Sequence, residues 1–270
     1  MRGVRLFGVL LATLGLTACL NSTTLVKLKP DGSGTVEQTT LMNMAALKGM
    51  IPGGANGGQA PQGPLMSKEE LERTAQRMGK GVRLLTTEQI KGDKGFEGTK
   101  AVFAFDDINQ IQISQDPGGS SMNAGDNKDS PVKFAFTKNP GGTSTLTINF
   151  NDQPVGDAGA RPDMPKTGGD MPDLTNPMIM NMIKTMFDGF KINIGLEVVG
   201  TIVKTNAEYV TGPHLTLLEM DMPALLADEA KLKALQGKIG PGASFSEVKP
   251  YLKDIKGIKI DGPSIRVEFK

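Results

Sequence analysis

Alternating hydrophobic and polar positions run through most of the chain and predict a largely β structure. The alternation is clearest in residues 23–28 and 35–41, which flank a Pro-Asp-Gly-Ser-Gly turn at 30–34. Successive side chains of a strand point to opposite faces, and a turn of this composition reverses the chain. These segments therefore predict a β-hairpin. Asp31 fits the backbone of the turn. A calcium site at Asp31 is not predicted, because no further carboxylates follow at the spacing of a calcium-binding loop.

The same pattern predicts further strands, bounded by Gly, Pro and Asn. They cover residues 82–86, 99–105, 111–113, 132–137, 143–150, 190–205, 209–220, 258–260 and 264–269. Gly195 and Gly200 mark expected bulges or bends within 190–205. The last two segments flank Asp261-Gly262-Pro263 and predict a terminal hairpin.

Helices are predicted where the apolar period changes to that of an α-helix. Ser67 and Glu70 form a capping-box pattern before one of them, and Asn176-Pro177 supplies an N-cap and a first-turn proline for another. Residues 223–236 predict a third, amphipathic helix. Helices interspersed with strands favour an α+β fold with a mainly antiparallel sheet, three or four helices and long Gly/Pro-rich loops. We expect one domain over residues 25–270, with flexible loops at 51–64, 115–130 and 151–172.

The N-terminus has the pattern of an export signal. Arg2 and Arg5 precede an apolar run at 6–16, which is shorter than the ~20 residues that a membrane-spanning helix needs. Leu16-Thr17-Ala18-Cys19 follows and resembles the lipobox of bacterial lipoproteins. The resemblance implies a signal peptide at 1–18 and an acylated Cys19 carrying diacylglyceryl and palmitate-type chains, with a short tether at 19–24.

That resemblance also implies an address. A protein acylated at Cys19 is held at a membrane of the cell envelope, outside the cytoplasm. Leu20 follows the cysteine, where an Asp would resemble the inner-membrane retention signal of Gram-negative lipoproteins. The absence of Asp permits sorting to the outer membrane of a Gram-negative cell, where the protein would face the periplasm, and leaves the inner membrane as the alternative.

Composition disfavours several classes of function. The formal net charge is only +1, without basic runs, which argues against nucleic acid as the main partner. Cys19 is the only cysteine, so no disulfide is predicted, and the single histidine, His214, has no Gly-x-Ser-x-Gly motif beside it. Asp106-Asp107 could be a paired carboxylate, although Asp107 serves equally well as a helix N-cap. We predict no catalytic residue, no metal site, no cofactor and no enzyme activity.

Methionine is the remaining candidate for a working surface. Six methionines lie between residues 164 and 186. Thioethers bind Cu(I), but they also fill irregular cores and form adaptable apolar surfaces. Within the predicted helix, apolar residues recur four apart and form a broad face. The possible apolar ligand surface comprises Met178, Ile179, Met182, Ile183, Met186 and Phe187.

A second resemblance concerns residues 25–42 and 196–220. A strand, the sequence Pro-Asp-Gly-Ser-Gly-Thr-Val and a second strand are similar to the start of LppM-like bacterial lipoproteins. A later strand pair, here 200–206 and 214–220, completes an α/β domain related to lipid-carrier folds in that family. Its mycobacterial members are linked to cell-envelope glycolipids. This chain has Val199-Gly200 where the family carries Pro-Gly.

Together these patterns predict a membrane-anchored, extracytoplasmic lipoprotein without enzyme activity. Its partners would be the membrane, through the N-terminal lipid, and a lipid or other apolar ligand or an envelope protein. The alternative is a structural or assembly accessory lipoprotein of an envelope complex, without a ligand pocket.

Overall fold

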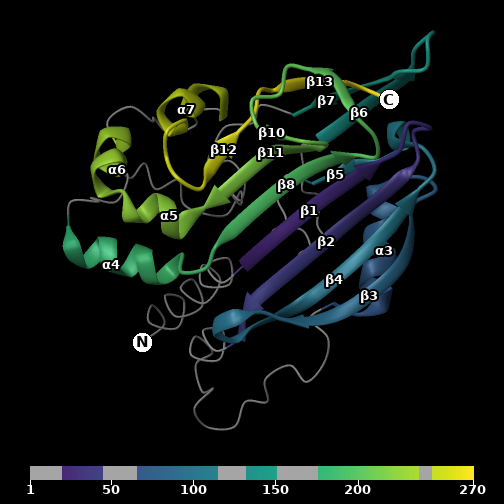
Figure 1. Cartoon of the computed structure of the whole chain (residues 1–270). Helices are drawn as coiled ribbons and strands as arrows, with labels where there is room; N and C mark the ends of the chain where they lie inside the picture. The colour runs from purple at the N-terminus through teal and green to yellow at the C-terminus, as the bar shows by residue number, and fades with distance from the viewer. Residues whose placement is uncertain (1–19, 45–65, 115–131, 151–175, 237–244) are drawn as a thin grey trace, which may run out of the picture.

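Two β-sheets make up most of the molecule (Figure 1). The structure is a computed structural model and describes residues 20–44, 66–114, 132–150, 176–236 and 245–270. Most neighbouring strands are antiparallel, which confirms the predicted α+β fold class. The three predicted loops at 51–64, 115–130 and 151–172 lie outside the described residues, as does Cys19.

The first sheet has eight strands in the order β10-β11-β8-β1-β2-β4-β3, with β12 paired to β11. Their bounds are β1 Leu20–Leu28, β2 Gly34–Asn43, β3 Arg83–Lys91, β4 Phe96–Phe105, β8 Lys191–Val198, β10 Val210–Thr211, β11 His214–Asp221 and β12 Ile258–Ile260.

The second sheet has five strands in the order β5-β6-β7-β13-β9. Their bounds are β5 Gln112–Ile113, β6 Val132–Lys138, β7 Ser144–Asn149, β9 Ile202–Thr205 and β13 Ser264–Phe269.

The N-terminal strand lies in the middle of the first sheet. On one side β1 forms the predicted hairpin with β2, in register from Leu20↔Met42 to Leu28↔Gly34. On its other side it runs parallel to β8, from Asn21↔Lys191 to Leu28↔Val198. Because β1 begins at Leu20, residues 20–24 belong to the sheet, and the prediction of a tether there was wrong. Alternation continues back to Leu20, whose side chain is only 2% exposed.

The main core lies between the two sheets and helix α3 (Lys68–Met78). The inward residues of α3 are the predicted Leu71, Ala75 and Met78. The predicted capping box is also present, because the Ser67 amide donates to Glu70 Oε2 at 2.7 Å and the Glu70 amide donates to Ser67 Oγ at 3.2 Å. Helix propensity, capping and burial therefore agree at this element.

The outer face of the first sheet carries cross-strand ion pairs. Lys27 Nζ lies 2.6 Å from Glu37 Oε1, and Lys100 Nζ lies 3.6 Å from Glu37 Oε2. The hydrogen bond from Lys27 lowers the pKa of Glu37. Lys27 is also paired in register with Glu197 on β8. Alternating charges of this kind suit a sheet face that remains in contact with water.

The chain crosses between the sheets at two places, where the sequence pattern predicts one continuous strand and a hairpin. Residues 190–205 form β8 and β9 in different sheets, and Gly200 makes the bend with φ +149°. A Cβ at Gly200 would lie 2.3 Å from the Lys270 carbonyl oxygen, so no larger side chain fits there. Likewise β12 and β13 do not pair, and Asp261-Gly262-Pro263 is a crossover, so the predicted terminal hairpin was wrong.

Four helices gather at one end of the first sheet (Figure 1). They are α4 (Pro177–Met186), α5 (Met222–Ala227), α6 (Glu229–Gln236) and α7 (Phe245–Leu252). The helix predicted at 223–236 is divided at Asp228, whose side chain accepts from the Lys231 amide at 3.2 Å. Helix α7 was not predicted. No helix in the described parts of the chain is long and apolar enough to cross a membrane.

Candidate functional site

The helical end of the molecule has two small apolar clusters separate from the main core. One contains Met180, Leu226 and Leu232 from α4, α5 and α6. The other contains Leu252 of α7, Ile255 of the following segment, and Ile258 and Ile260 of β12. Leu225 packs against both clusters. Because each cluster is small, this end is held by fewer apolar contacts than the body of the protein.

Local signals define α4 as predicted. The Asn176 side chain accepts a hydrogen bond from the Met178 amide at 3.0 Å, and Pro177 occupies the first turn. At the other end the Phe187 amide donates to the Ile183 carbonyl at 2.9 Å. The Phe187 and Phe190 rings then meet edge to face, 5.8 Å apart, where the chain turns toward β8.

The predicted apolar surface of α4 is divided between two sides of the helix. Ile183 and Phe187 pack with Met180 against α5 and α6. Met178 and Met182 are exposed, at 81% and 56% of their surface. Ile179 is half-buried, and the side chain of Met186 lies outside the described part of the chain. The structure therefore leaves two methionines, four residues apart, as the accessible part of the surface.

Two exposed methionines on one helical face form an adaptable apolar surface. Methionine is unbranched and polarizable, so it adapts to irregular apolar partners. Transferring such a side chain fully from water into an apolar environment stabilises by about 1.5–3 kcal/mol. Met178 and Met182 can therefore supply free energy to an association without any change in the fold.

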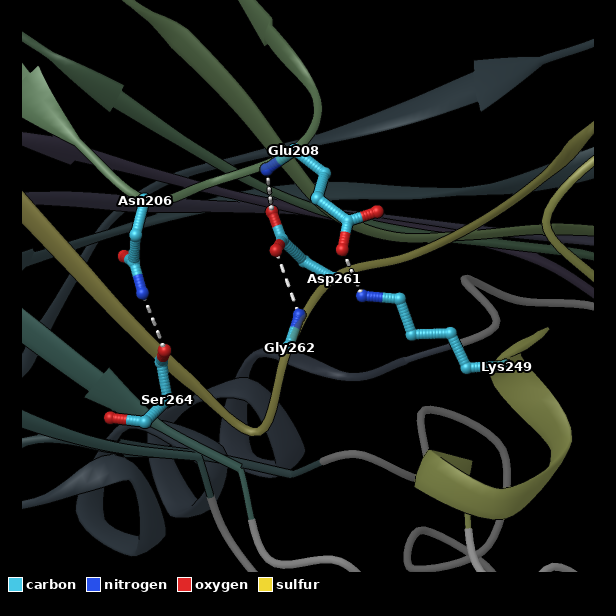
Figure 2. A network of polar contacts seen from close by, with 6 residues as sticks. All are labelled: Asn206, Glu208, Lys249, Asp261, Gly262 and Ser264. Atoms are coloured by element: carbon cyan, nitrogen blue, oxygen red, sulfur yellow. Dashed lines mark hydrogen bonds and ion pairs between the residues drawn. The ribbon is translucent and has the colours of Figure 1, made fainter.

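A polar network beside the α7 cluster ties the crossover at 261–263 to the segment after β9 (Figure 2). Asp261, only 7% exposed, accepts from the Gly262 amide at 2.7 Å and from the Glu208 amide at 3.1 Å. The Glu208 carboxylate pairs with Lys249 Nζ of α7 at 2.5 Å. Asn206 Nδ2 donates to the Ser264 carbonyl at 3.1 Å. The network thus joins both sheets and α7.

Burial raises the pKa of Asp261, and the two backbone N–H donors only partly oppose this effect. The neighbouring Glu208 behaves in the opposite way, because its hydrogen bond with Lys249 lowers its pKa. A buried carboxyl with a raised pKa can act as a proton donor or acceptor. Here both carboxylate oxygens accept backbone N–H groups, so the contacts shown are those of a structural clamp.

The hollow beside this network is small. It encloses essentially no space for a water molecule and is lined by Tyr209, Lys249, Leu252, Lys253, Ile258 and Ile260. Pockets for drug-sized ligands are typically about 300–1,000 Å³. The hollow is therefore too small for a lipid.

We predict that the contribution of Asp261 to stability falls as pH rises. The folded-state pKa lies above that of the unfolded chain, so the folded protein holds this proton more tightly. The stabilisation is complete below the unfolded pKa, near ~3.9, and is lost as pH rises to the raised folded value. Asp261→Asn does not titrate, so the wild type should lose stability relative to this variant over that window.

Urea unfolding of both proteins at a series of pH values measures this difference. Loss of one backbone hydrogen bond in the variant adds an offset of about 0.5–1.5 kcal/mol that does not depend on pH. A wild-type advantage that grows with pH would show that the charged carboxylate is the stabilising form, contrary to the prediction.

The other residues considered for chemistry do not come together. Asp106 Oδ1 pairs with Arg83 Nη1 at 2.9 Å, whereas Asp107 caps a short 3-10 helix by accepting from the Asn109 amide at 2.9 Å. His214 of β11 is paired in register with Glu197 of β8. Its ring lies over Gly195, and Cε1 of the ring would be 2.8 Å from a Cβ at that glycine. Within the described ranges, no three His, Cys, Asp or Glu side chains are placed to hold a metal ion.

Two features of this region were missed in the sequence. Asp261 was assigned to a turn, and its Asp-Gly-Pro context carries no sign that two sheets meet there. Met180 was not placed on the predicted surface, although it is the most deeply buried of the described methionines of α4. Met180 is two residues from both Met178 and Met182, and residues two apart point to opposite sides of an α-helix. This spacing is the signal that could have separated the two sides of the helix.

Comparison with known proteins gives a distant likeness. No protein-family model matches the chain, and no curated protein matches it. Among solved structures, it is similar to the NMR structure of the folded domain of Mycobacterium tuberculosis LppM, with a TM-score of 0.36 and 10% identity over 93% of this chain and 90% of that one. That score is too low for any residue or role to be transferred.

Proposed function

We propose that the protein is a lipid-anchored protein of the cell envelope that binds lipid or another apolar ligand through the exposed side of α4. The observation that carries the proposal is the pair Met178 and Met182, 81% and 56% exposed, on a helix whose other side is packed. The resemblance of residues 16–19 to a lipobox supports the proposed anchor and location.

The chemistry of the surface supports an apolar ligand. Thioether side chains present no hydrogen-bond donor and only a weak acceptor, so they select against polar ligands. The nearest charged group on the helix, Lys184, is paired with Glu229 at 2.7 Å. The surface therefore has no free charge of its own helix beside it to recognise an ionic headgroup.

The hollow at α7 encloses essentially no space, and this favours a second candidate. In that case the protein is an accessory lipoprotein that contributes to the assembly of an envelope complex and holds no ligand. The exposed methionines would then contact a protein partner.

Native mass spectrometry distinguishes the two candidates. The processed full-length protein, released from detergent micelles after incubation with envelope lipid extract, is expected to carry a discrete lipid mass. The double variant Met178→Gln/Met182→Gln should lose at least ~90% of that complex, which corresponds to about 1.4 kcal/mol.

The matched control is Leu85→Gln/Val203→Gln, which changes two equally exposed apolar residues elsewhere, both at 52%. This variant should retain the lipid. A ligand-free spectrum with every lipid class, or equal loss in both double variants, would contradict a discrete lipid-binding site at α4 and favour the accessory role.

A further inference from the structure

We infer that the lipid met by Met178 and Met182 is the bilayer that holds the anchor, so that α4 lies on the membrane and fixes the orientation of the domain. This inference rests on the proposed acylation of Cys19 and names the partner of the same surface. It follows from the position of α4 relative to the first residue of β1.

The sheet fixes which end of the molecule is anchored. Cys19 is the residue before Leu20, and Leu20 is already paired with Met42 of β2. A strand that begins one residue after the anchor leaves no length of chain to hold the domain away from the bilayer. The end of the first sheet at which β1 begins and β2 ends is therefore next to the membrane.

Helix α4 is attached to that same end of the first sheet. Lys191, the first residue of β8, is in register with Asn21, so the chain that leaves α4 enters the sheet beside the start of β1. The connecting segment also touches β4, because a Cβ at Gly189 would lie 2.4 Å from Cζ of Phe96. Phe96 is paired with Asn43 at the end of β2. The segment between α4 and β8 therefore lies along the end of the first sheet that is next to the anchor.

The exposed side of α4 points away from the body of the protein. In Figure 1, α5 and α6 lie above α4, and α4 is at the left, at the end where β1 begins. Met180 packs toward α5 and α6. Met178 and Met182 are two residues away in either direction, about 200° around a helix with 100° per residue, and so lie on the opposite side. The exposed methionines therefore lie on the side of α4 that faces the anchored end of the molecule.

Two lysines at this end of the sheet, Lys184 and Lys191, are paired with carboxylates. Lys184 lies 2.7 Å from Glu229, and Lys191 lies 2.6 Å from Asp221. Paired charges give little attraction to anionic headgroups, so contact with the bilayer depends on apolar burial and is expected to vary little with salt. The anchor makes this contact intramolecular, so two methionines suffice where a free protein would need more.

Tryptophan fluorescence tests the inference, because the natural chain contains no Trp. Met182→Trp and Leu85→Trp each introduce a single reporter at positions of similar exposure, 56% and 52%. Leu85 lies next to Leu84, which pairs with Phe103. Phe103 pairs with Val36, and Val36 with Val26, so the control lies about six residues, or ~20 Å, along the sheet from Leu20.

Both variants are purified from membranes in lipidated form and reconstituted into phosphatidylcholine vesicles with brominated acyl chains. An indole at Met182 that reaches the headgroup–acyl boundary, about 5–10 Å deep, is expected to be quenched at least ~2-fold more than the one at Leu85. The difference should persist at high salt. Circular dichroism spectra that match the wild type show that both variants are folded.

Each other outcome overturns the inference in a distinguishable way. Equal quenching of the two reporters in acylated protein would mean that α4 does not contact the bilayer, while the anchor stands. An intact mass without acyl chains would remove the anchor itself, and with it both the proposed function and this inference.

Discussion

Replacing Cys19 with alanine is expected to abolish acylation of the protein completely. The thiol is the only one in the chain, so no other residue can accept a thioether-linked diacylglyceryl group. Each buried methylene contributes about 0.8 kcal/mol to membrane attachment, and at least two acyl chains are needed for stable anchoring. We therefore expect the Cys19→Ala protein to lose the membrane attachment that the proposed acyl chains supply.

Metabolic labelling with an alkynyl fatty acid measures this effect, and the intact mass confirms it. Thr17→Ser is the matched control, because it retains a small hydroxyl residue within the lipobox and should be labelled like the wild type. Fatty-acid incorporation into the Cys19→Ala protein would contradict the lipobox interpretation, as would an unlabelled wild type.

The second large effect is expected on stability. Phe269→Ala should lower the free energy of unfolding by about 3–5 kcal/mol, the usual range for removing a buried aromatic ring. Phe269 is 0% exposed, and its strand β13 pairs with β7 on one side and β9 on the other. The ring also packs against Phe136 at a centroid distance of 6.4 Å. The substitution leaves a cavity that cannot close without moving three strands.

Guanidinium unfolding followed by circular dichroism measures the change. Because a typical domain is stable by only about 5–15 kcal/mol, the expected loss is a large part of the total. Val203→Ala on the neighbouring β9 is the control, since a side chain 52% exposed should change stability by less than ~0.5 kcal/mol. A cost below ~1 kcal/mol at Phe269 would contradict the close packing between the sheets.

Features set by neighbouring residues were predictable from the sequence. The capping box of α3, the N-cap of α4 and the hairpins β1–β2 and β6–β7 depend on contacts within a few positions. Hydrophobic alternation also located most of the strands, because it reports a face that is buried.

Features set by distant partners were not predictable. Alternation shows that β9, β12 and β13 are strands, but it does not show which sheet each one joins. The α-helical period likewise predicted α4 but not its orientation. Apolar residues at 178, 179, 180, 182 and 183 surround the helix, so its buried side is decided by Leu225, Leu226 and Leu232, more than 40 residues along the chain. The accessible methionines could be identified only from that packing.

The parallel pairing of β1 with β8 has a consequence for how the protein is made. At a synthesis rate of about 5–20 residues per second, β8 follows β1 from the ribosome only after some ten seconds or more. During this interval one edge of β1 has no partner, and an open strand edge is a template for aggregation. Pairing across such a sequence separation also slows folding. The polypeptide must therefore be kept unfolded or shielded until Val198 is available, and a chain truncated before β8 would expose its most central strand.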